Sequence, residues 1–174
     1  ALIVHKKDGC RSAELRYHSY KIIDGKPILE GLPSVYLNEN DKAQTLVITL
    51  KDKGYDLFVE TYYTVIEGHD EIMRSQKIIN RTGGEIFLES ALSLNLDMEN
   101  SHKEFETITF YGVANDERRI DRSPLTHTKK TVQSSTGMTS HNTNNSIIIC
   151  EEGTDEEKGI CYAASLVYSG NFVI

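Results

Sequence analysis

The sequence predicts an all-β fold built from antiparallel sheets. Segments rich in β-branched and aromatic residues recur along the 174 residues, as in TLVITL at 45–50 and DLFVETYYTVI at 56–66. Many segments alternate apolar and polar side chains with the period of two that a strand imposes. Turn sequences containing Gly, Asn or Asp separate these segments at nearly regular intervals. We therefore expect about ten strands, arranged as a sandwich in one domain.

The first long strand is expected at residues 14–23, ELRYHSYKII. Strict alternation would place Tyr17 on one side of this strand and Tyr20 and Ile22 on the other. The dipeptide Asp24-Gly25 then predicts a turn. After it, ILEGLPSVYL is interrupted by glycine and proline and is expected to form no more than a short edge strand or an extended crossing.

The clearest hairpin joins the strands at 45–50 and 56–66 through KDKGY, in which Gly54 is expected to supply a positive φ. A further strand, EIMRSQKIIN at 71–80, follows the turn EGHD. Residues 85–97 contain leucine and alanine, which favour helix, but they alternate strictly and therefore predict another strand.

The second half of the chain continues the pattern. Strands are expected at 105–111, 147–150 and 159–168, with an acidic hairpin tip before the last. The charged run NDERRIDR at 115–122 is interpreted as a solvated turn. The final residues, YSGNFVI, are apolar to the end of the printed chain, which indicates a piece of a longer protein.

The segment 134–145, SSTGMTSHNTNN, resembles a functional site more than a scaffold. Hydroxyl and amide side chains dominate it, together with His141, and almost no residue in it could build a core. A segment this polar cannot be a core strand, so we expect a loop held in place by the flanking strands.

Charge and cysteine content exclude several classes of partner. The net charge of -7 and the pI near 5.4 do not fit a protein that binds nucleic acid or an anionic membrane. Cys10, Cys150 and Cys161 form no CxxC and no Cys/His ligand pattern, so we expect no metal or other cofactor and a reducing, cytoplasmic location. The chain also lacks an apolar run of the roughly 18 residues that span a membrane.

Several chemical functions remain open on the residues alone. His127 and His141 flank the polar loop, and with a carboxylate such as Glu117 they could transfer protons on a sugar ring, as an aldose epimerase does. Histidines within sheets are more often surface or structural residues. Asn, His and Tyr side chains also suit a sugar-binding module. The phosphate loop GxxxxGK[ST] and the nucleophile motif GxSxG are absent, which argues against nucleotide binding and serine hydrolase chemistry.

Seven segments together resemble, in this order, the amino-terminal domain of family 36 glycoside hydrolases, the bacterial α-galactosidases. They are LRYHSYKIIDGKPILEGLPSVYL (15–37), TLVITLKDK (45–53), RSQKIIN (74–80), SALSLNLD (90–97), DERR (116–119), SPLTHTKKTVQSSTGMTSHNTNN (123–145) and YSGNF (168–172). No single segment would suffice, but their order and spacing agree over essentially the whole chain. The family's usual SSHQxNPF is TSHNTNNSI here, which keeps Ser140, His141 and Asn144 and loses the Gln, Pro and Phe.

The resemblance implies a galactose-mutarotase-like β-supersandwich over residues 1–174, followed by a catalytic (β/α)8 barrel that this chain lacks. Such enzymes resemble retaining hydrolases that remove terminal α-linked galactose from melibiose and raffinose with two barrel carboxylates. No catalytic residue is therefore expected in this chain. Its expected partners are its own barrel and, in the full-length enzyme, galactosides and further copies in a homo-oligomer. Ser140, His141 and Asn144 are expected at an interface or near substrate.

Overall fold

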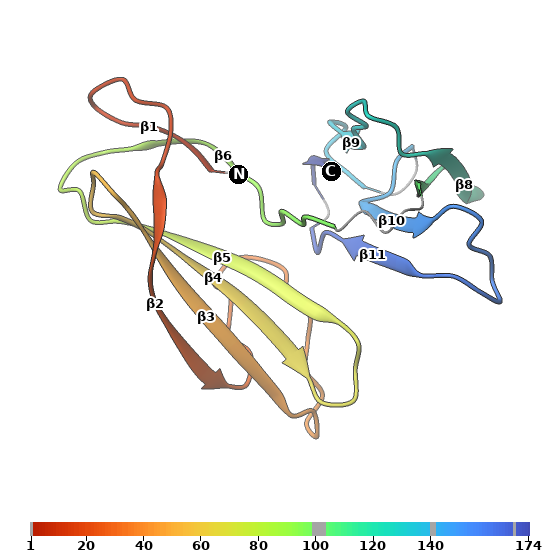
Figure 1. Cartoon of the computed structure of the whole chain (residues 1–174), viewed down its shortest axis with the longest axis horizontal. Helices are drawn as coiled ribbons and strands as arrows, with labels where there is room; N and C mark the ends of the chain where they lie inside the picture. Colours follow the sequence, from red (N-terminus) through yellow and green to blue (C-terminus); the bar gives the residue numbers. More distant parts are fainter. Residues whose placement is uncertain (1, 99–103, 140–141, 169) are drawn as a thin grey trace. The chain divides into compact units, whose positions relative to one another are not determined.

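The computed structural model describes residues 2–98, 104–139, 142–168 and 170–174 (Figure 1). All regular secondary structure in these ranges is β-strand, and every strand pair is antiparallel. The predicted all-β class is therefore confirmed. No helix in the described ranges is long and apolar enough to cross a membrane. The chain divides into two compact units: unit 1 comprises residues 1–30 and 35–97, and unit 2 comprises residues 31–34 and 98–174.

Unit 1 holds two sheets. Its strands are β1 (Leu2–His5), β2 (Leu15–Asp24), β3 (Ala43–Asp52), β4 (Leu57–Ile66), β5 (Ile72–Asn80) and β6 (Phe87–Ala91). Consecutive hairpins build a four-stranded sheet in the order β2-β3-β4-β5, and β1 pairs with β6. The strands predicted at 14–23, 45–50, 56–66 and 71–80 are confirmed within two residues at each end.

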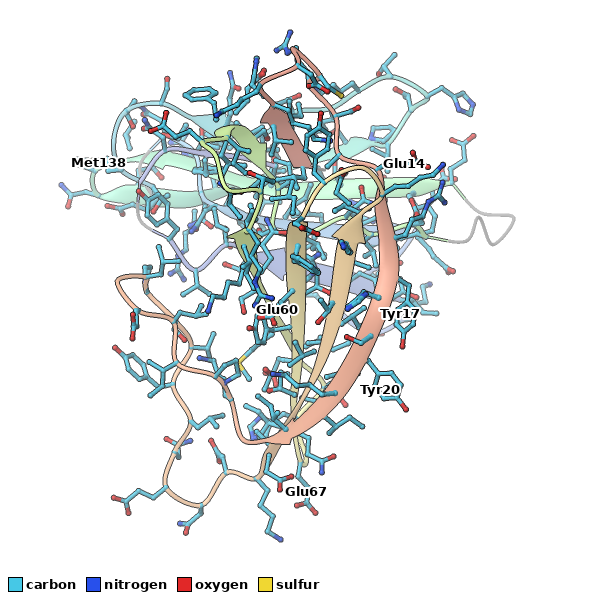
Figure 2. All side chains as sticks on the ribbon, turned by 90° about the vertical axis from the view of Figure 1, so that its left-hand side faces the viewer. Glu14, Tyr17, Tyr20, Glu60, Glu67 and Met138 are labelled. Atoms are coloured by element: carbon cyan, nitrogen blue, oxygen red, sulfur yellow. The ribbon has the colours of Figure 1, made fainter. Side chains whose placement is uncertain are left out.

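A bulge in β2 changes which side chains share a face. Tyr17 and Ser19 pair with consecutive residues of β3, so the register skips His18. An extra residue of this kind reverses the alternation that follows it. The predicted alternation is therefore wrong here: Tyr17 lies on the same face of the sheet as Tyr20 and Ile22. Figure 2 shows both tyrosines projecting from β2 to the same side.

The β3–β4 turn depends on a side chain and not on a glycine conformation. The Asp52 carboxylate accepts hydrogen bonds from the backbone N–H groups of Gly54 and Tyr55, both at 3.0 Å. This arrangement is an Asx turn, in which an aspartate replaces a backbone acceptor. The positive φ predicted at Gly54 is not found, whereas Gly25 after β2 and Gly68 after β4 have φ of 80° and 79°.

The centre of the four-stranded sheet is apolar with one buried polar pair. Val47 and Leu57 are fully buried. Thr45 and Thr64 lie opposite each other on β3 and β4, and their hydroxyl oxygens are 2.7 Å apart. Thr45 in turn donates to the Gly25 carbonyl at 2.7 Å, so both buried hydroxyls are satisfied.

The strand predicted at 85–97 is much shorter than expected. Only β6 (Phe87–Ala91) is a strand, and its partner is β1, which the sequence did not reveal. β1 contains four residues, so it can pair with only a short piece of the alternating segment. Leu92 and the residues after it have no strand partner, because alternation alone cannot supply one.

Unit 2 also holds two sheets. Its strands are β7 (Phe105–Val113), β8 (Asp116–Pro124), β9 (Gln133–Ser134), β10 (Ser146–Glu151), β11 (Cys161–Ser165) and β12 (Phe172–Val173). The larger sheet has the order β11-β10-β7-β8, and β9 pairs with β12. The strands predicted at 105–111 and 147–150 are confirmed, and the one at 159–168 is shorter than predicted.

The charged run at 115–122 is not a turn, and that interpretation is wrong. It forms most of β8, one of the two edge strands of the larger sheet, and nearly all of its residues are exposed. Charged side chains are a common device for preventing edge strands from pairing with other molecules. The turn itself is confined to the short link after Val113, where Asn115 has a φ of 66°.

Candidate functional site

Hydrogen bonds within unit 2 hold the polar loop 134–145 in place. Ser134 is buried in β9, and its hydroxyl donates to the Met138 carbonyl at 3.0 Å. The backbone N–H of Gly137 donates to the Asn171 side chain at 2.7 Å. Several of the polar groups that made this segment resemble a site therefore stabilise the loop itself.

The three loop residues singled out from the sequence have different outcomes. Ser140 and His141 lie outside the described residues. Asn144 is half-buried, and its backbone N–H donates to the Phe110 carbonyl of β7 at 2.9 Å. The expectation that these residues meet an interface or a substrate stays a prediction.

An open depression of about 470 Å³ lies beside the loop in unit 2. Its lining comes from β7, β8, the segment before β9, β9 itself and one loop residue: Thr109, Phe110, Tyr111, Asp121, Lys130, Thr131, Val132, Gln133 and Thr143. Hydroxyl, amide and carboxylate groups next to a partly exposed tyrosine ring suit a neutral, hydroxyl-rich ligand.

Lys130 connects the segment before β9 to strands β7 and β8 at this depression. Its Nζ donates to the Thr107 hydroxyl at 2.7 Å and to the Ser123 hydroxyl, and it lies 3.7 Å from the Asp121 carboxylate. These partners engage the ammonium group, so Lys130 positions the segment before β9 against β7 and β8. It is poorly suited to act as an acid or base.

The histidines proposed for proton transfer do not line the depression. His127 is exposed and is not among the lining residues, and neither is Glu117. Glu117 instead accepts a hydrogen bond from the backbone N–H of Asn115 at 3.0 Å. With His141 outside the described residues, the described part of unit 2 does not assemble an acid–base pair of the epimerase kind. The described residues also contain no group of three or more His, Cys, Asp or Glu side chains that could hold a metal ion.

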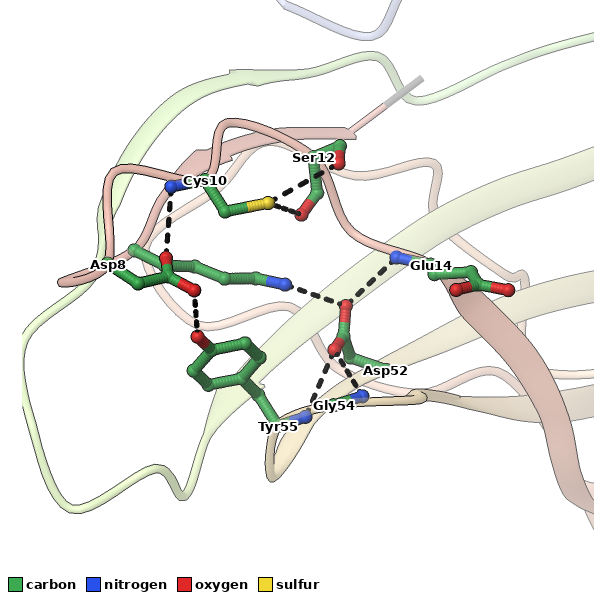
Figure 3. Close-up of polar contacts among 8 residues, drawn as sticks. Asp8, Cys10, Ser12, Glu14, Asp52, Gly54 and Tyr55 are labelled. Atoms are coloured by element: carbon green, nitrogen blue, oxygen red, sulfur yellow. Dashed lines mark hydrogen bonds and ion pairs between the residues drawn. The ribbon is translucent and has the colours of Figure 1, made fainter.

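The most completely connected polar cluster lies in unit 1 and was not predicted (Figure 3). Its centre is Asp52, which is 2% exposed and accepts a hydrogen bond from the Lys6 Nζ at 3.1 Å. The same carboxylate accepts the N–H groups of Glu14 at 2.9 Å and of Gly54 and Tyr55. The Lys6 ammonium also lies 4.2 Å from the centre of the Tyr55 ring, a cation–π distance.

The electrostatics of this cluster favour the charged carboxylate. Burial raises the pKa of Asp52, but the N–H of Gly54 and the Lys6 ammonium outweigh burial and hold that pKa below its usual value. Nearby, the Tyr55 hydroxyl donates to Asp8 and lowers the pKa of that carboxyl. Because its acceptors are already occupied, the cluster has no capacity for a ligand and fastens the chain near the amino terminus to the β3–β4 turn. The signal in the sequence was an aspartate two residues before a glycine at the end of a strand.

The four-stranded sheet of unit 1 presents an apolar face to solvent. We use the name apolar face for the exposed side chains Tyr17, Tyr20 and Ile22 of β2, Val65 of β4 and Ile72 of β5. The three on β2 are 64%, 64% and 62% exposed. Exposed apolar side chains that gather on one side of a sheet in this way suit an interaction site.

Arg74 of β5 lies on the same side of the sheet. It pairs with Tyr63 of β4, and its guanidinium carbon is 5.4 Å from the centre of that ring. Its Nη1 atom is buried and has no hydrogen-bond partner among the described residues. An unpaired buried donor is costly.

Comparisons with known proteins agree with the resemblance read from the sequence. The family model for the glycosyl hydrolase family 36 N-terminal domain matches residues 1–174. A bifunctional α-galactosidase/sucrose kinase of Mediterraneibacter gnavus is 41% identical over 172 residues, which are 99% of this chain and 18% of that protein. An α-galactosidase of Lactobacillus acidophilus is 38% identical over 98% of this chain and 23% of its own length.

A solved structure matches the fold equally well. The crystal structure of a family 36 α-galactosidase from Geobacillus stearothermophilus superposes with a TM-score of 0.93 at 35% identity, covering 99% of this chain and 24% of that one. This likeness confirms the fold class predicted from the sequence, the all-β supersandwich of antiparallel sheets. This chain spans about a quarter or less of the relatives and structures that it matches.

Proposed function

The chain belongs to the glycosyl hydrolase family 36 N-terminal domain family, and we propose that it is the non-catalytic amino-terminal domain of an α-galactosidase. In this proposal the whole enzyme removes terminal α-linked galactose from oligosaccharides of the melibiose and raffinose type. The names of the relatives support the activity. Related Geobacillus stearothermophilus enzymes have been solved in complex with raffinose and with stachyose, which supports the substrate class. Cleavage would retain the anomeric configuration, with both catalytic carboxylates in the rest of the enzyme.

The observation that carries the proposed role is the apolar face of unit 1. Fully burying one large apolar side chain contributes about 1.5–3 kcal/mol. Tyr17, Tyr20 and Ile72 are each more than 60% exposed, so most of that free energy is still to be gained. We propose that the catalytic part of the same polypeptide covers this face and supplies the acceptor for Arg74.

A pair of tyrosines provides a matched test of this docking in the full-length enzyme. Tyr20→Ser removes a ring from the apolar face, whereas Tyr36→Ser removes an exposed ring that is not on the sheet. Tyr20→Ser should lower the melting temperature of the enzyme and increase hydrogen exchange in β2 and β3, while Tyr36→Ser should change neither. An unchanged melting temperature and unchanged exchange in Tyr20→Ser would show that the apolar face is not an interface.

The absence of a catalytic role is tested separately from docking. The 174-residue chain should not hydrolyse nitrophenyl α-galactoside, and the full-length enzyme should. Turnover by the short chain, removed by substitutions within residues 1–174, would assign it a catalytic site of its own and sink the proposal.

A second candidate function is sugar binding at the depression in unit 2. Its carrying observation is the partly exposed Tyr111 ring beside Asp121 and Gln133. Calorimetry with raffinose on the full-length enzyme inactivated at a catalytic carboxylate should detect a second site that Tyr111→Ala removes. Heat that fits a single site unaffected by this change would eliminate the idea.

We also propose a cytoplasmic location and a homo-oligomeric full-length enzyme. Three free cysteines support a reducing compartment. Light scattering on the full-length enzyme tests the assembly, and a monomer at micromolar concentration would contradict it.

A further inference from the structure

Two cysteines face each other across strands β10 and β11. Cys150 and Cys161 are direct partners in the antiparallel register, so their side chains lie on the same face of the sheet. Cys150 is fully buried and Cys161 is exposed, and both are free thiols. One sulfur is therefore accessible to small molecules, and its neighbour is shielded.

The hydrogen-bond pattern of the ladder determines how close these two residues lie. Two backbone hydrogen bonds fix this pattern: the Glu151 N–H donates to the Ile160 carbonyl at 3.3 Å, and the Leu166 N–H donates to the Asn145 carbonyl at 3.0 Å. In antiparallel pairs, hydrogen-bonded and non-hydrogen-bonded partners alternate, which places Cys150 and Cys161 in a non-hydrogen-bonded pair. Such pairs have Cα atoms about 4.5 Å apart, within the roughly 4.4–6.8 Å that a disulfide spans.

The surroundings of the Cys150 sulfur shield it from solvent. Burial raises the pKa of the Cys150 thiol. Cys150 also lies 3.8 Å from the Glu106 carbonyl as a weak donor. The Arg122 guanidinium bonds to the Glu106 carboxylate at 2.9 Å and lowers the pKa of Cys150 against the effect of burial.

We propose that Cys150 and Cys161 form a reversible dithiol/disulfide modification site whose oxidant is a peroxide. The Cys161 thiol attacks hydrogen peroxide, the O–O bond breaks, and a sulfenic acid and one water are formed. Cys150 sulfur then attacks the sulfenic sulfur, the S–O bond breaks, and the departing hydroxide takes the Cys150 proton as a second water. Two electrons pass from the two sulfurs to the peroxide.

The β10–β11 turn explains why the oxidant should be small and neutral. Four of its side chains are carboxylates: Glu152, Asp155, Glu156 and Glu157. An anionic disulfide such as oxidised glutathione is repelled by this surface, whereas hydrogen peroxide is not. The bond would close the turn and tie β11, the other edge strand of this sheet, to β10.

The position of a lysine makes the test specific in the full-length enzyme. Lys158 lies between the two cysteines, so trypsin separates them into a peptide of residues 131–158 and a peptide that begins at Gly159. After mild peroxide treatment, thiol blocking and digestion without reductant, mass spectrometry should find these two peptides linked, and dithiothreitol should release them. Hydrogen exchange in β11 should slow at least tenfold in the linked protein.

Single-residue variants provide the controls. Cys161→Ser and Cys150→Ala should each abolish the linked peptides, and Cys10→Ser should leave them unchanged. Irreversible oxidation of Cys161 with Cys150 still a thiol, a link to Cys10 or to glutathione, or no modification at all would each overturn the proposal.

Discussion

Replacing Lys6 by methionine should destabilise unit 1 by about 2–3 kcal/mol. The change keeps the length and apolar stem of the side chain and removes the ammonium that contacts Asp52 at 3.1 Å, where the two side chains are 6% and 2% exposed. Removing one partner of a buried ion pair typically costs about 3–5 kcal/mol. The lower figure is expected here because the carboxylate keeps three backbone N–H donors.

A double-mutant cycle separates the ion pair from the turn that Asp52 also stabilises. Asp52→Asn should cost about 3–4 kcal/mol because it weakens both, and the Lys6→Met/Asp52→Asn variant should cost little more than Asp52→Asn alone. The coupling energy should therefore be about 2 kcal/mol. Lys53→Met is the control: Lys53 is 70% exposed and 3.9 Å from Glu14, so its loss should cost less than about 0.5 kcal/mol.

Urea unfolding followed by circular dichroism and by tyrosine fluorescence measures these free energies. Coincidence of the two signals checks the two-state assumption on which the cycle depends. At this chain length, Lys6→Met should also lower the melting temperature by about 5–10 °C. Coupling below about 0.5 kcal/mol, or a Lys53→Met cost equal to that of Lys6→Met, would refute a stabilising role for the buried pair.

Three further predictions concern the same scaffold. Gly112→Ala should destabilise unit 2 by more than about 2 kcal/mol in urea unfolding, because its new Cβ would lie 2.4 Å from the carbonyl oxygen of Asp116 in β8. Gly137→Ala is the comparison: a Cβ there meets open space, but the φ of 80° should cost about 1 kcal/mol of backbone strain. The pKa of Asp52 in the folded protein lies below its value of about 3.9 in the unfolded chain. The charged carboxylate therefore stabilises the fold above about pH 3.9, and this stabilisation is lost as the pH falls through the folded pKa. The urea midpoint should fall more steeply below about pH 4 in the wild type than in Asp52→Asn. Lys130→Met should expose the segment before β9 to proteolysis, because three contacts with β7 and β8 are lost, and an unchanged digestion pattern would contradict its positioning role.

The sequence predicted the central strands of the sheets better than the edge strands and the short strands. The strands at 45–50 and 56–66 have partners on both sides, and their apolar pattern was sufficient to place them. β8 is an edge strand, so its charged side chains resembled a turn, and β1 is too short to show a period. Pairing is decided by contacts between distant segments, which a local pattern does not contain.

The β2 bulge had the largest consequence for function. A period-two pattern in the sequence does not show a bulge, so it placed Tyr17 and Tyr20 on opposite faces of the sheet. The pairing of β2 with β3 places them on the same face. The apolar face was therefore hidden in the sequence. The polar loop, by contrast, was obvious from composition, yet Ser134 and Gly137 use polar atoms to hold the loop itself.

Segments that carried the family resemblance thus do structural work that composition could not assign. Asp52 is the next-to-last residue of TLVITLKDK and ties the β3–β4 turn to Lys6, and Arg74 begins RSQKIIN on the same side of the sheet as the apolar face. The buried Nη1 of Arg74 has no acceptor among the described residues, at a cost of about 1–3 kcal/mol if it stayed so. The exposed apolar face and the unpaired donor would both be stabilised by a second surface that supplies apolar side chains and a hydrogen-bond acceptor. This chain spans 18% and 23% of two of its relatives, and we propose that the rest of the polypeptide provides that surface.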